Sequence, residues 1–320
     1  MTDQPFQWED SGKVFGPDKG PDWMVTHAQV PTPLIDEAAG ILRVYFASRP
    51  RRDVTLMSFV DLDIEDPRRI VHVNPTPLLE LGAPGTFDEH GTMPSCAVRC
   101  GDQVYLYYSG WSRTTSVPYT NSTGLAISDD GGRTFRRAGQ GPVLAKSLGD
   151  PFSATSPFVM RTAEQWRMWY CSGTGWPEIE GKYEHVYDIK EAISDDGIFW
   201  KPTGKTTMAA NPHEEALTRP WIARTCEGWR LWYCHRRAAD FRDGPGAYTI
   251  ASASSADLQS WEPVGHDGPS GRTDGWDSSM QAYPALVVVQ NRLLMLYNGN
   301  DFGASGFGLC ATEDHERKTL

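Results

Sequence analysis

A repeat of 61 to 64 residues constrains this chain more than any other feature of its sequence. In each unit a proline within an apolar stretch is followed, 13 residues later, by an aromatic residue. The five proline–aromatic pairs are Pro33 and Phe46, Pro94 and Tyr107, Pro157 and Tyr170, Pro220 and Tyr233, and Pro284 and Tyr297. Short alternating strands that recur at such a period are typical of a radial β-repeat. The sequence therefore predicts an all-β fold, a five-bladed β-propeller with four-stranded blades, as a single domain covering residues 1–320.

The two ends of the chain predict how the ring closes. Three units continue into an Asp-containing turn and an aromatic that opens a fourth strand, whereas the last unit ends at Leu320 soon after its third strand. We expect the N-terminal segment 6–16, with Trp8, to pair beside residues 308–312 and supply the missing strand. Closing the ring in this way removes exposed sheet edges.

One turn has a recognisable motif. Ser128-x-Asp130-x-Gly132-x-Thr134-Phe135 matches the Asp box found in many propellers. Its Ser and Asp side chains are expected to accept local backbone N–H groups, and its glycine to take a positive φ. The motif is therefore predicted to be scaffold and not part of a catalytic site.

Composition limits the classes of binding partner and the cellular compartment that we expect. A formal net charge of −11 argues against nucleic acid and against an anionic membrane as partners. The N-terminal residues have neither the basic nor the apolar region of a signal peptide, and we expect a cytoplasmic protein. Cys96 and Cys100, the closest cysteine pair, lack a second pair or a nearby histidine for zinc. The six cysteines are predicted to be free thiols, with no metal and no cofactor.

The propeller geometry predicts where a site lies. The innermost strand of a blade and its neighbour are antiparallel, so residues just before each proline share one face of the ring with residues just after each aromatic. Loops from all blades converge there, at one end of the channel. The candidates before the prolines are His27, Gln29, Asp88, His90, Asp150, Glu215, Arg219, Asp277 and Gln281. The candidates after the aromatics are Arg49, Trp111, His235, Asn298 and Asn300.

These residue types suit a sugar. Carboxylates and amides bond hydroxyl groups, aromatic faces stack on sugar rings, and two carboxyls serve as acid and base or nucleophile. We assign catalysis to Asp88, His90, Asp150, Glu215 and Asp277, and substrate binding to the other nine candidates. Arg219 is expected to meet a carboxylate or the ligand, since an unpaired buried guanidinium is costly.

Structural roles remain open for several candidates. Asp88 follows Phe87 and Asp277 follows Trp276, so a repeated aromatic–Asp pair would also serve to tie neighbouring blades. Asp150 precedes a proline, as a turn opener does. The histidines have the alternative of packing under loops.

Several stretches indicate a family resemblance. They are Phe87-Asp88-x-x-Gly91-x-Met93-Pro94-Ser95, Arg167-Met168-Trp169-Tyr170, Ile193-Ser194-Asp195-Asp196-Gly197-x-x-Trp200 and Tyr297-Asn298-Gly299-Asn300. In these the chain resembles the five-bladed propellers of the arabinanase/levansucrase/invertase superfamily. The resemblance implies glycoside hydrolysis or glycosyl transfer by three carboxylates from different blades. Several of these usually stand beside the inner-strand proline, where this chain has no acidic residue.

The leading expectation is a glycoside hydrolase-like enzyme acting on a small sugar or glycoconjugate in the central channel. One alternative is a phosphorylase, lyase or isomerase on a charged sugar. In that case the phosphate or carboxylate would be held by Arg49, Arg219, Arg236, His27, His90 and His235. The other alternative is a non-catalytic propeller that binds a glycan or a protein.

Overall fold

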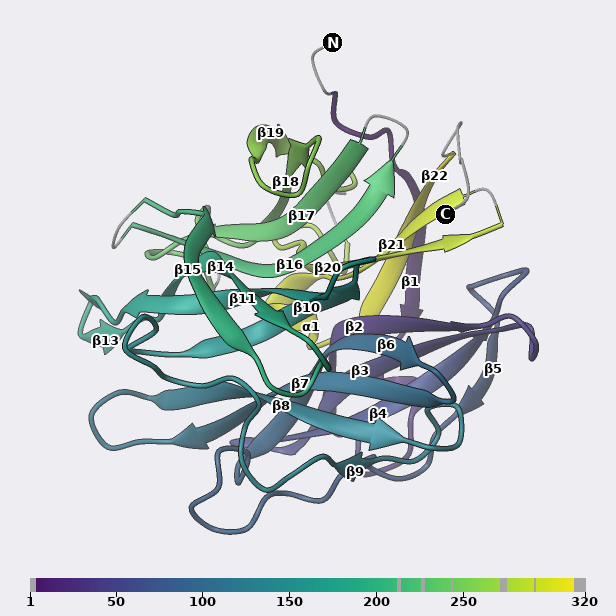
Figure 1. Cartoon of the computed structure of the whole chain (residues 1–320). Helices are drawn as coiled ribbons and strands as arrows, with labels where there is room; N and C mark the ends of the chain where they lie inside the picture. Colours follow the sequence, from purple (N-terminus) through teal and green to yellow (C-terminus); the bar gives the residue numbers. More distant parts are fainter. Residues whose placement is uncertain are drawn as a thin grey trace.

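The computed structural model describes residues 4–211, 214–225, 228–242, 244–270, 275–290 and 292–313. Apart from the short 3₁₀ helix η1 (Pro17–Lys19) and the four-residue helix α1 (Asn300–Gly303), the regular elements in these ranges are strands (Figure 1). The predicted all-β class is confirmed.

Antiparallel ladders of four strands recur along the described chain. The first ladder is β2 (Thr26–Asp36), β3 (Ile41–Arg51), β4 (Val54–Asp63) and β5 (Ile70–Val73). The second is β6 (Gly91–Cys100), β7 (Gln103–Arg113), β8 (Tyr119–Ser128) and β9 (Arg136–Arg137). The third is β10 (Ala154–Arg161), β11 (Trp166–Gly175), β14 (Val186–Ser194) and β15 (Lys201–Met208), with the small hairpin β12 (Glu178–Ile179) and β13 (Lys182–Tyr183) inserted after β11. The fourth is β16 (Glu215–Thr225), β17 (Gly228–Arg237), β18 (Thr249–Ser255) and β19 (Glu262–His266).

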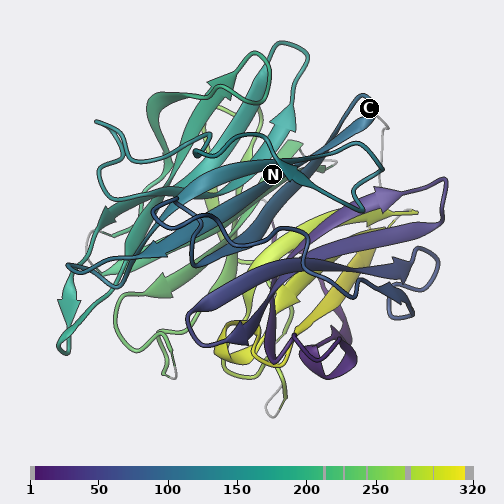
Figure 2. The ribbon, with the colours of Figure 1, turned by 90° about the horizontal axis from the view of Figure 1, so that it is seen from below.

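The last ladder joins the two ends of the chain. It is formed by β20 (Ala282–Val289), β21 (Arg292–Asn298), β22 (Phe307–Glu313) and β1 (Glu9–Phe15). β1 pairs antiparallel with β22, from Glu9 opposite Ala311 to Phe15 opposite Phe307. The purple β1 and the yellow β22 run side by side in Figure 1, and purple and yellow strands gather on one side of the molecule in Figure 2.

Trp8 lies just before β1 and has a different partner from the one expected. Its indole Nε1 donates to the backbone oxygen and to Oδ1 of Asp267, at 3.2 and 3.3 Å, beyond the end of the fourth ladder. The N-terminal segment thus contacts the fourth ladder before it pairs with the last one. Single parallel bridges connect the first three ladders into one sheet, and in the described residues no sheet closes on itself.

The innermost strands share an unusual backbone feature. In four of them the residue directly before a proline has a positive φ and lies within a β-bulge: Val30 (59°), Ser156 (48°), Arg219 (57°) and Tyr283 (59°). Such a conformation is strained for a residue with a side chain, by about 1–3 kcal/mol each, and persists only where its surroundings hold it.

Side chains from the preceding ladder hold these bulges. The backbone N–H of each strained residue donates to a side chain in the ladder before it. That side chain lies one or two residues after the aromatic of the ladder's proline–aromatic pair. The pairs are Val30 with Asn298 Oδ1 (2.7 Å), Ser156 with Ser109 Oγ (3.0 Å), Arg219 with Cys171 Sγ (3.3 Å) and Tyr283 with Cys234 Sγ (2.8 Å). Two of the buried thiols expected from the sequence are therefore hydrogen-bond acceptors between ladders.

Arg219 links the first ladder to the second, where no such bulge contact is found. In the second ladder Met93, the residue before Pro94, is not among the residues with a positive φ. The buried guanidinium of Arg219 instead donates to Pro31 O (3.0 Å) and Thr32 Oγ1 (2.9 Å) on β2 and to Ser95 O on β6. Burial lowers the pKa of Arg219 to about 10.

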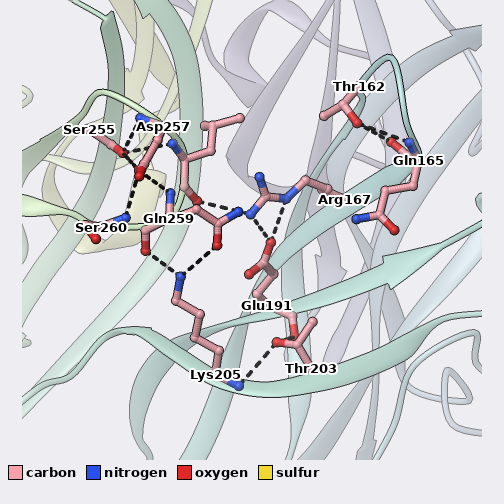
Figure 3. Close-up of polar contacts among 11 residues, drawn as sticks. Thr162, Gln165, Arg167, Glu191, Thr203, Lys205, Ser255, Asp257, Gln259 and Ser260 are labelled. Carbon is pink, nitrogen blue, oxygen red and sulfur yellow. Dashed lines mark hydrogen bonds and ion pairs between the residues drawn. The ribbon is translucent and has the colours of Figure 1, made fainter.

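The turns that open the fourth strands dock on the neighbouring ladder. In the Asp box, Asp130 Oδ1 accepts the backbone N–H of Arg133 and Thr134 at 2.9 and 3.0 Å, so the predicted scaffold role is confirmed. Tyr45 of the first ladder donates to the carbonyl of Gly132 in this turn. Figure 3 shows the equivalent contact between the third and fourth ladders, where Arg167 pairs with Glu191 and donates to the backbone oxygen of Leu258 (3.1 Å).

Removing one bulge contact tests how much it contributes to the free energy of unfolding. Asn298 is fully buried and also donates to Ala28 O and Gly306 O, both at 2.8 Å. We expect Asn298→Ala to lower the free energy of unfolding by about 3 kcal/mol, because three buried backbone groups lose their partners. Urea denaturation measures this, with exposed Asn211→Ala, expected to cost less than about 0.5 kcal/mol, as the control. Equal stability of the two variants would contradict the role of these contacts.

Candidate active site

A cavity of about 730 Å³ opens where the ladders meet. Its lining comes from every ladder, for example Gln29 on β2, Trp111 on β7, Thr155 on β10, Thr218 on β16 and Tyr283 on β20. Three of the strained residues, Val30, Ser156 and Tyr283, are part of this lining. The size suits a small-molecule site, since such sites measure roughly 300–1,000 Å³.

The cavity is rich in cations although the chain as a whole is acidic. Five arginines line it: Arg49, Arg52, Arg113, Arg236 and Arg242. The carboxylates among its described lining residues are Asp53 and Glu184. In a protein with a formal net charge of −11, this local excess of positive charge favours an anionic ligand.

Both carboxylates have an arginine partner. Glu184 is buried, and Arg242 donates to both of its oxygens, at 2.9 Å from Nη2 to Oε2. Asp53 is half exposed and lies 3.4 Å from Arg113 Nη1. Such pairing offsets part of their negative charge and so weakens their repulsion of an anion.

Two arginines are free to bind a ligand. Among the described residues, the guanidinium groups of Arg49 and Arg52 have no hydrogen bond or ion pair. Burial lowers the pKa of Arg49, and the charge of Asp53 opposes that effect. Arg49 remains a cation at neutral pH, because guanidinium groups do not lose their proton in proteins. It is therefore a partly buried charge with no carboxylate within ion-pair distance among the described residues.

Tyrosines and a third arginine form the opposite wall. Arg236 is buried and donates to Tyr248 Oη (3.1 Å), and its guanidinium lies 3.8 Å from the ring centre of Phe241. The hydroxyls of Tyr119 and Tyr187 are 3.2 Å apart. Burial raises the pKa of both tyrosines, so at neutral pH they present neutral O–H groups to the cavity.

Buried polar atoms at the lining lack protein partners. Among the described residues they are Gln29 Oε1, Asn121 Oδ1, Thr155 Oγ1 and Thr218 Oγ1, from four different ladders, on side chains less than a tenth exposed. An unpartnered buried polar atom costs about 1–3 kcal/mol unless a ligand or water satisfies it. Their positions favour a ligand with several hydroxyl groups.

Of the fourteen predicted site residues, three line this cavity: Gln29, Arg49 and Trp111. Trp111 is fixed by a hydrogen bond from its Nε1 to Thr55 Oγ1 (2.8 Å). His90, predicted to be catalytic, lies beside Trp111 with ring centres 5.6 Å apart and is not in the lining.

The three predicted catalytic aspartates are buried behind the cavity and bonded to tyrosines. Asp88, Asp150 and Asp277 each accept from the tyrosine 20 residues later, Tyr108, Tyr170 and Tyr297, at 3.0, 3.2 and 2.8 Å. Asp88 and Asp150 are also paired with Arg137 and Lys190. Asp88, Asp150, Glu215 and Asp277 are not among the residues that line this cavity, and their assignment to catalysis stays a prediction. Their contacts are those of ties within and between ladders.

The remaining candidates lie around the cavity without lining it. Glu215 pairs with His235 at 3.1 Å on the β16–β17 hairpin. His27 has a pKa lowered to about 4 by burial and by Arg49, so it is neutral at pH 7. Gln281 and Asn298 are buried, and Asn300 accepts the backbone N–H groups of Ser279 and Met280. Arg219 meets neutral oxygens and not the expected carboxylate.

Sequence reasoning missed both lining carboxylates. Asp53 stands in the tight turn between β3 and β4, and Glu184 in the insertion between β11 and β14. Arg242 comes from a second insertion, after β17. The insertions after β11 and β17 appear in the sequence as interruptions of the repeat. This was the only sequence signal that pointed to Glu184 and Arg242.

The described part of the chain has neither a metal-ligand cluster nor a membrane-spanning helix. It contains no cluster of three or more His, Cys, Asp or Glu side chains placed to hold a metal ion. No helix in it is long and apolar enough to span a bilayer. Cys226 lies outside the described residues, and the other five cysteines form no disulfide.

Comparison with known proteins gives relatives in sequence. No family model matches the chain. It is 34% identical over 309 residues to "Uncharacterized protein Rv1502" of Mycobacterium tuberculosis (strain ATCC 25618 / H37Rv), covering 96% of this chain and 99% of that protein. "Uncharacterized protein MT1551" of Mycobacterium tuberculosis (strain CDC 1551 / Oshkosh) matches with the same identity and coverage.

Solved structures give the fold. A protein described as "Glycoside hydrolase" aligns with a TM-score of 0.73 at 13% identity, covering 99% of this chain and 94% of that one. An endo-arabinase from Bacteroides thetaiotaomicron VPI-5482 aligns with a TM-score of 0.64 at 12% identity, covering 97% and 99%. A protein of the GH130 family, described as mannoside phosphorylases that include glycoside hydrolases acting on β-1,2 mannosidic linkages in Candida mannan, aligns with a TM-score of 0.66 at 14% identity, covering 99% and 96%. The expected resemblance to glycoside hydrolase-like propeller proteins is confirmed at the level of fold.

The Asp–Tyr contacts give a test that separates structure from catalysis. We expect Asp88→Ala to lower the free energy of unfolding by roughly 3 kcal/mol, because Tyr108 and Arg137 lose a buried charged partner. The neighbouring Glu89→Ala, at a less buried carboxylate, serves as the control in the same thermal denaturation. An Asp88→Ala protein of unchanged stability that has lost sugar binding or turnover would restore Asp88 to the site.

Proposed function

Because this chain belongs to one family with the Mycobacterium tuberculosis protein Rv1502 and has the fold of glycoside hydrolase-like proteins, we propose that it is a carbohydrate-active enzyme acting on an anionic sugar. The observation that carries the proposal is the unpaired Arg49 and Arg52 in a cavity whose two lining carboxylates are both paired with arginine. The unpartnered amide and hydroxyl atoms beside them suit sugar hydroxyls.

The proposal includes the architecture. We propose that the five ladders are the blades of a single propeller domain and that β1 completes the last blade. Two regularities support this reading: bulge contacts run in chain order from the second ladder to the third, the third to the fourth and the fourth to the last, and one runs from the last ladder back to the first. We place the enzyme in the cytoplasm, since its described cysteines form no disulfide.

The chemistry proposed is cleavage of a glycosidic bond. Asp53, a half-exposed carboxylate of the cavity lining that lies beside Arg113, is our candidate for the group that exchanges a proton with the substrate. Glu184, held by Arg242, would stabilise the positive charge that develops on the sugar ring in the transition state. Asp53 and Glu184 replace the four carboxylates first considered for this task.

The anion at Arg49 and Arg52 has two possible sources with the same chemistry. It is either a phosphate or carboxylate on the sugar itself, or inorganic phosphate that attacks the anomeric carbon in place of water. We propose the first source, and the likeness to a structure described in terms of mannoside phosphorylases makes the second the alternative to test. A screen of glycosides with and without inorganic phosphate separates them, since only phosphorolysis releases a sugar 1-phosphate.

Arg49 gives the direct test of anion binding. Isothermal titration with glucose 6-phosphate, galacturonic acid, inorganic phosphate and glucose measures the preference for charge. We expect at least one of the anions to bind, and Arg49→Gln to weaken it roughly 10- to 100-fold, because a hydrogen bond to a charged group is worth about 1.5–3 kcal/mol. Arg51→Gln, on the same strand and outside the cavity lining, should leave affinity unchanged. Glucose binding as tightly as the anions, with no effect of Arg49→Gln, would refute the proposal.

A further inference from the structure

A second hollow lies beside the cavity. It is a groove of about 490 Å³ lined by Ser116, Val117, Lys146, Phe152, Thr174, Gly175, Trp176 and Pro177. The loop between β7 and β8 forms a wall common to both hollows: Thr114 and Pro118 line the cavity, whereas Ser116 and Val117 line the groove. The two hollows are therefore neighbours, and the loop of residues 114–118 lies between them.

Aromatic contacts make a second connection. The ring of Tyr119, which lines the cavity, meets Trp176 of the groove edge-on, with centres 5.0 Å apart. A ligand that leaves the cavity past Tyr119 reaches Trp176 next. The two residues come from different ladders, β8 and the segment after β11.

The orientation of Trp176 is fixed from behind. Its indole stacks on the buried imidazole of His185, with ring centres 4.0 Å apart and an angle of 15° between the planes. His185 Nε2 lies 3.2 Å from Ser153 Oγ. Burial, with the nearby charges of Arg236 and Lys146, lowers the pKa of His185 to about 3, so the supporting ring is neutral at pH 7. A partly exposed indole held in this way is a ready platform for a flat, weakly polar surface such as the C–H face of a sugar ring.

The groove also carries a free cation. Lys146 is exposed, and among the described residues its ammonium group has no hydrogen bond or ion pair. Lys146 is the one charged side chain among the described residues that line the groove. An aromatic platform next to a lone ammonium suits a sugar that bears a negative charge, or one bonded to such a sugar.

We infer that this groove is a second sugar-binding subsite, and that the ligand of the enzyme has at least two sugar units, one in the cavity and the next on Trp176. The inference rests on the proposed function, because it takes the cavity to hold an anionic sugar. It narrows the substrate class to anionic disaccharides and longer anionic glycans. Trp176 is a specificity-determining residue for chain length, and the loop of residues 114–118 separates the two units.

Matched pairs of probes test chain length directly. Titration calorimetry compares galacturonic acid with its α-1,4-linked dimer, and glucose 6-phosphate with trehalose 6-phosphate, on the full chain. We expect the disaccharide of at least one pair to bind five- to tenfold more tightly than the monosaccharide. Trp176→Ala should remove this advantage and leave monosaccharide affinity unchanged. Val117→Trp, which fills the groove from the loop between β7 and β8, should do the same.

Each outcome decides the inference. If the monosaccharides bind and the disaccharides show no advantage, the subsite is refuted and the proposed function survives. If the advantage persists in Val117→Trp, the second unit lies elsewhere and the subsite is again refuted. If no anionic probe binds, the proposed function fails and the subsite with it. Loss of the advantage in Val117→Trp, with the melting temperature and monosaccharide affinity retained, supports the subsite even if Trp176→Ala proves unstable.

Discussion

The guanidinium of Arg219 and the four strained bulges around it hold the inner strands in place. Each bulge places a residue with a positive φ directly before a proline, a conformation that the isolated strand would not keep. In each case a side chain from the preceding ladder accepts the exposed N–H group. The second ladder has no residue of positive φ before its inner-strand proline, and Arg219 connects the first and second ladders. The conformation of every inner strand thus depends on its neighbours.

The same constraint shapes the site. Val30, Ser156 and Tyr283 lie at the cavity wall because the bulges turn the inner strands there. The acceptors that hold the bulges, such as Asn298 and Cys234, are fully used by these contacts and are not free to bind a ligand. Ligand contacts therefore fall to residues at the strand ends and in the insertions, among them Arg49, Asp53 and Glu184. The residues that hold the bulges and the residues that face the cavity are neighbours in the sequence but have different roles.

This division explains which features the sequence could predict. The spacing from proline to aromatic predicted the strand pairs of each ladder, and the incomplete last unit predicted that the N-terminal segment would pair with β22. Gln29, Arg49 and Trp111, which the antiparallel geometry assigned to this face, line the cavity, and their role in binding stays a prediction. Asp88, Asp150 and Asp277 were expected at the site because an aspartate near an inner strand has the same sequence pattern whether it bonds to a tyrosine or to a sugar. Asp53 and Glu184 lie in a turn and an insertion, whose path no periodicity determines.

The most direct test of the account is a crystal structure of the protein soaked with an anionic disaccharide such as trehalose 6-phosphate or α-1,4-digalacturonic acid. The account predicts electron density for the anionic group within hydrogen-bonding distance of Arg49, hydroxyl contacts to Gln29, Asn121 or Thr155, and a second ring on Trp176. A sugar bound outside this cavity, or one flanked by Asp88, Asp150 or Asp277 with Arg49 unoccupied, would contradict it.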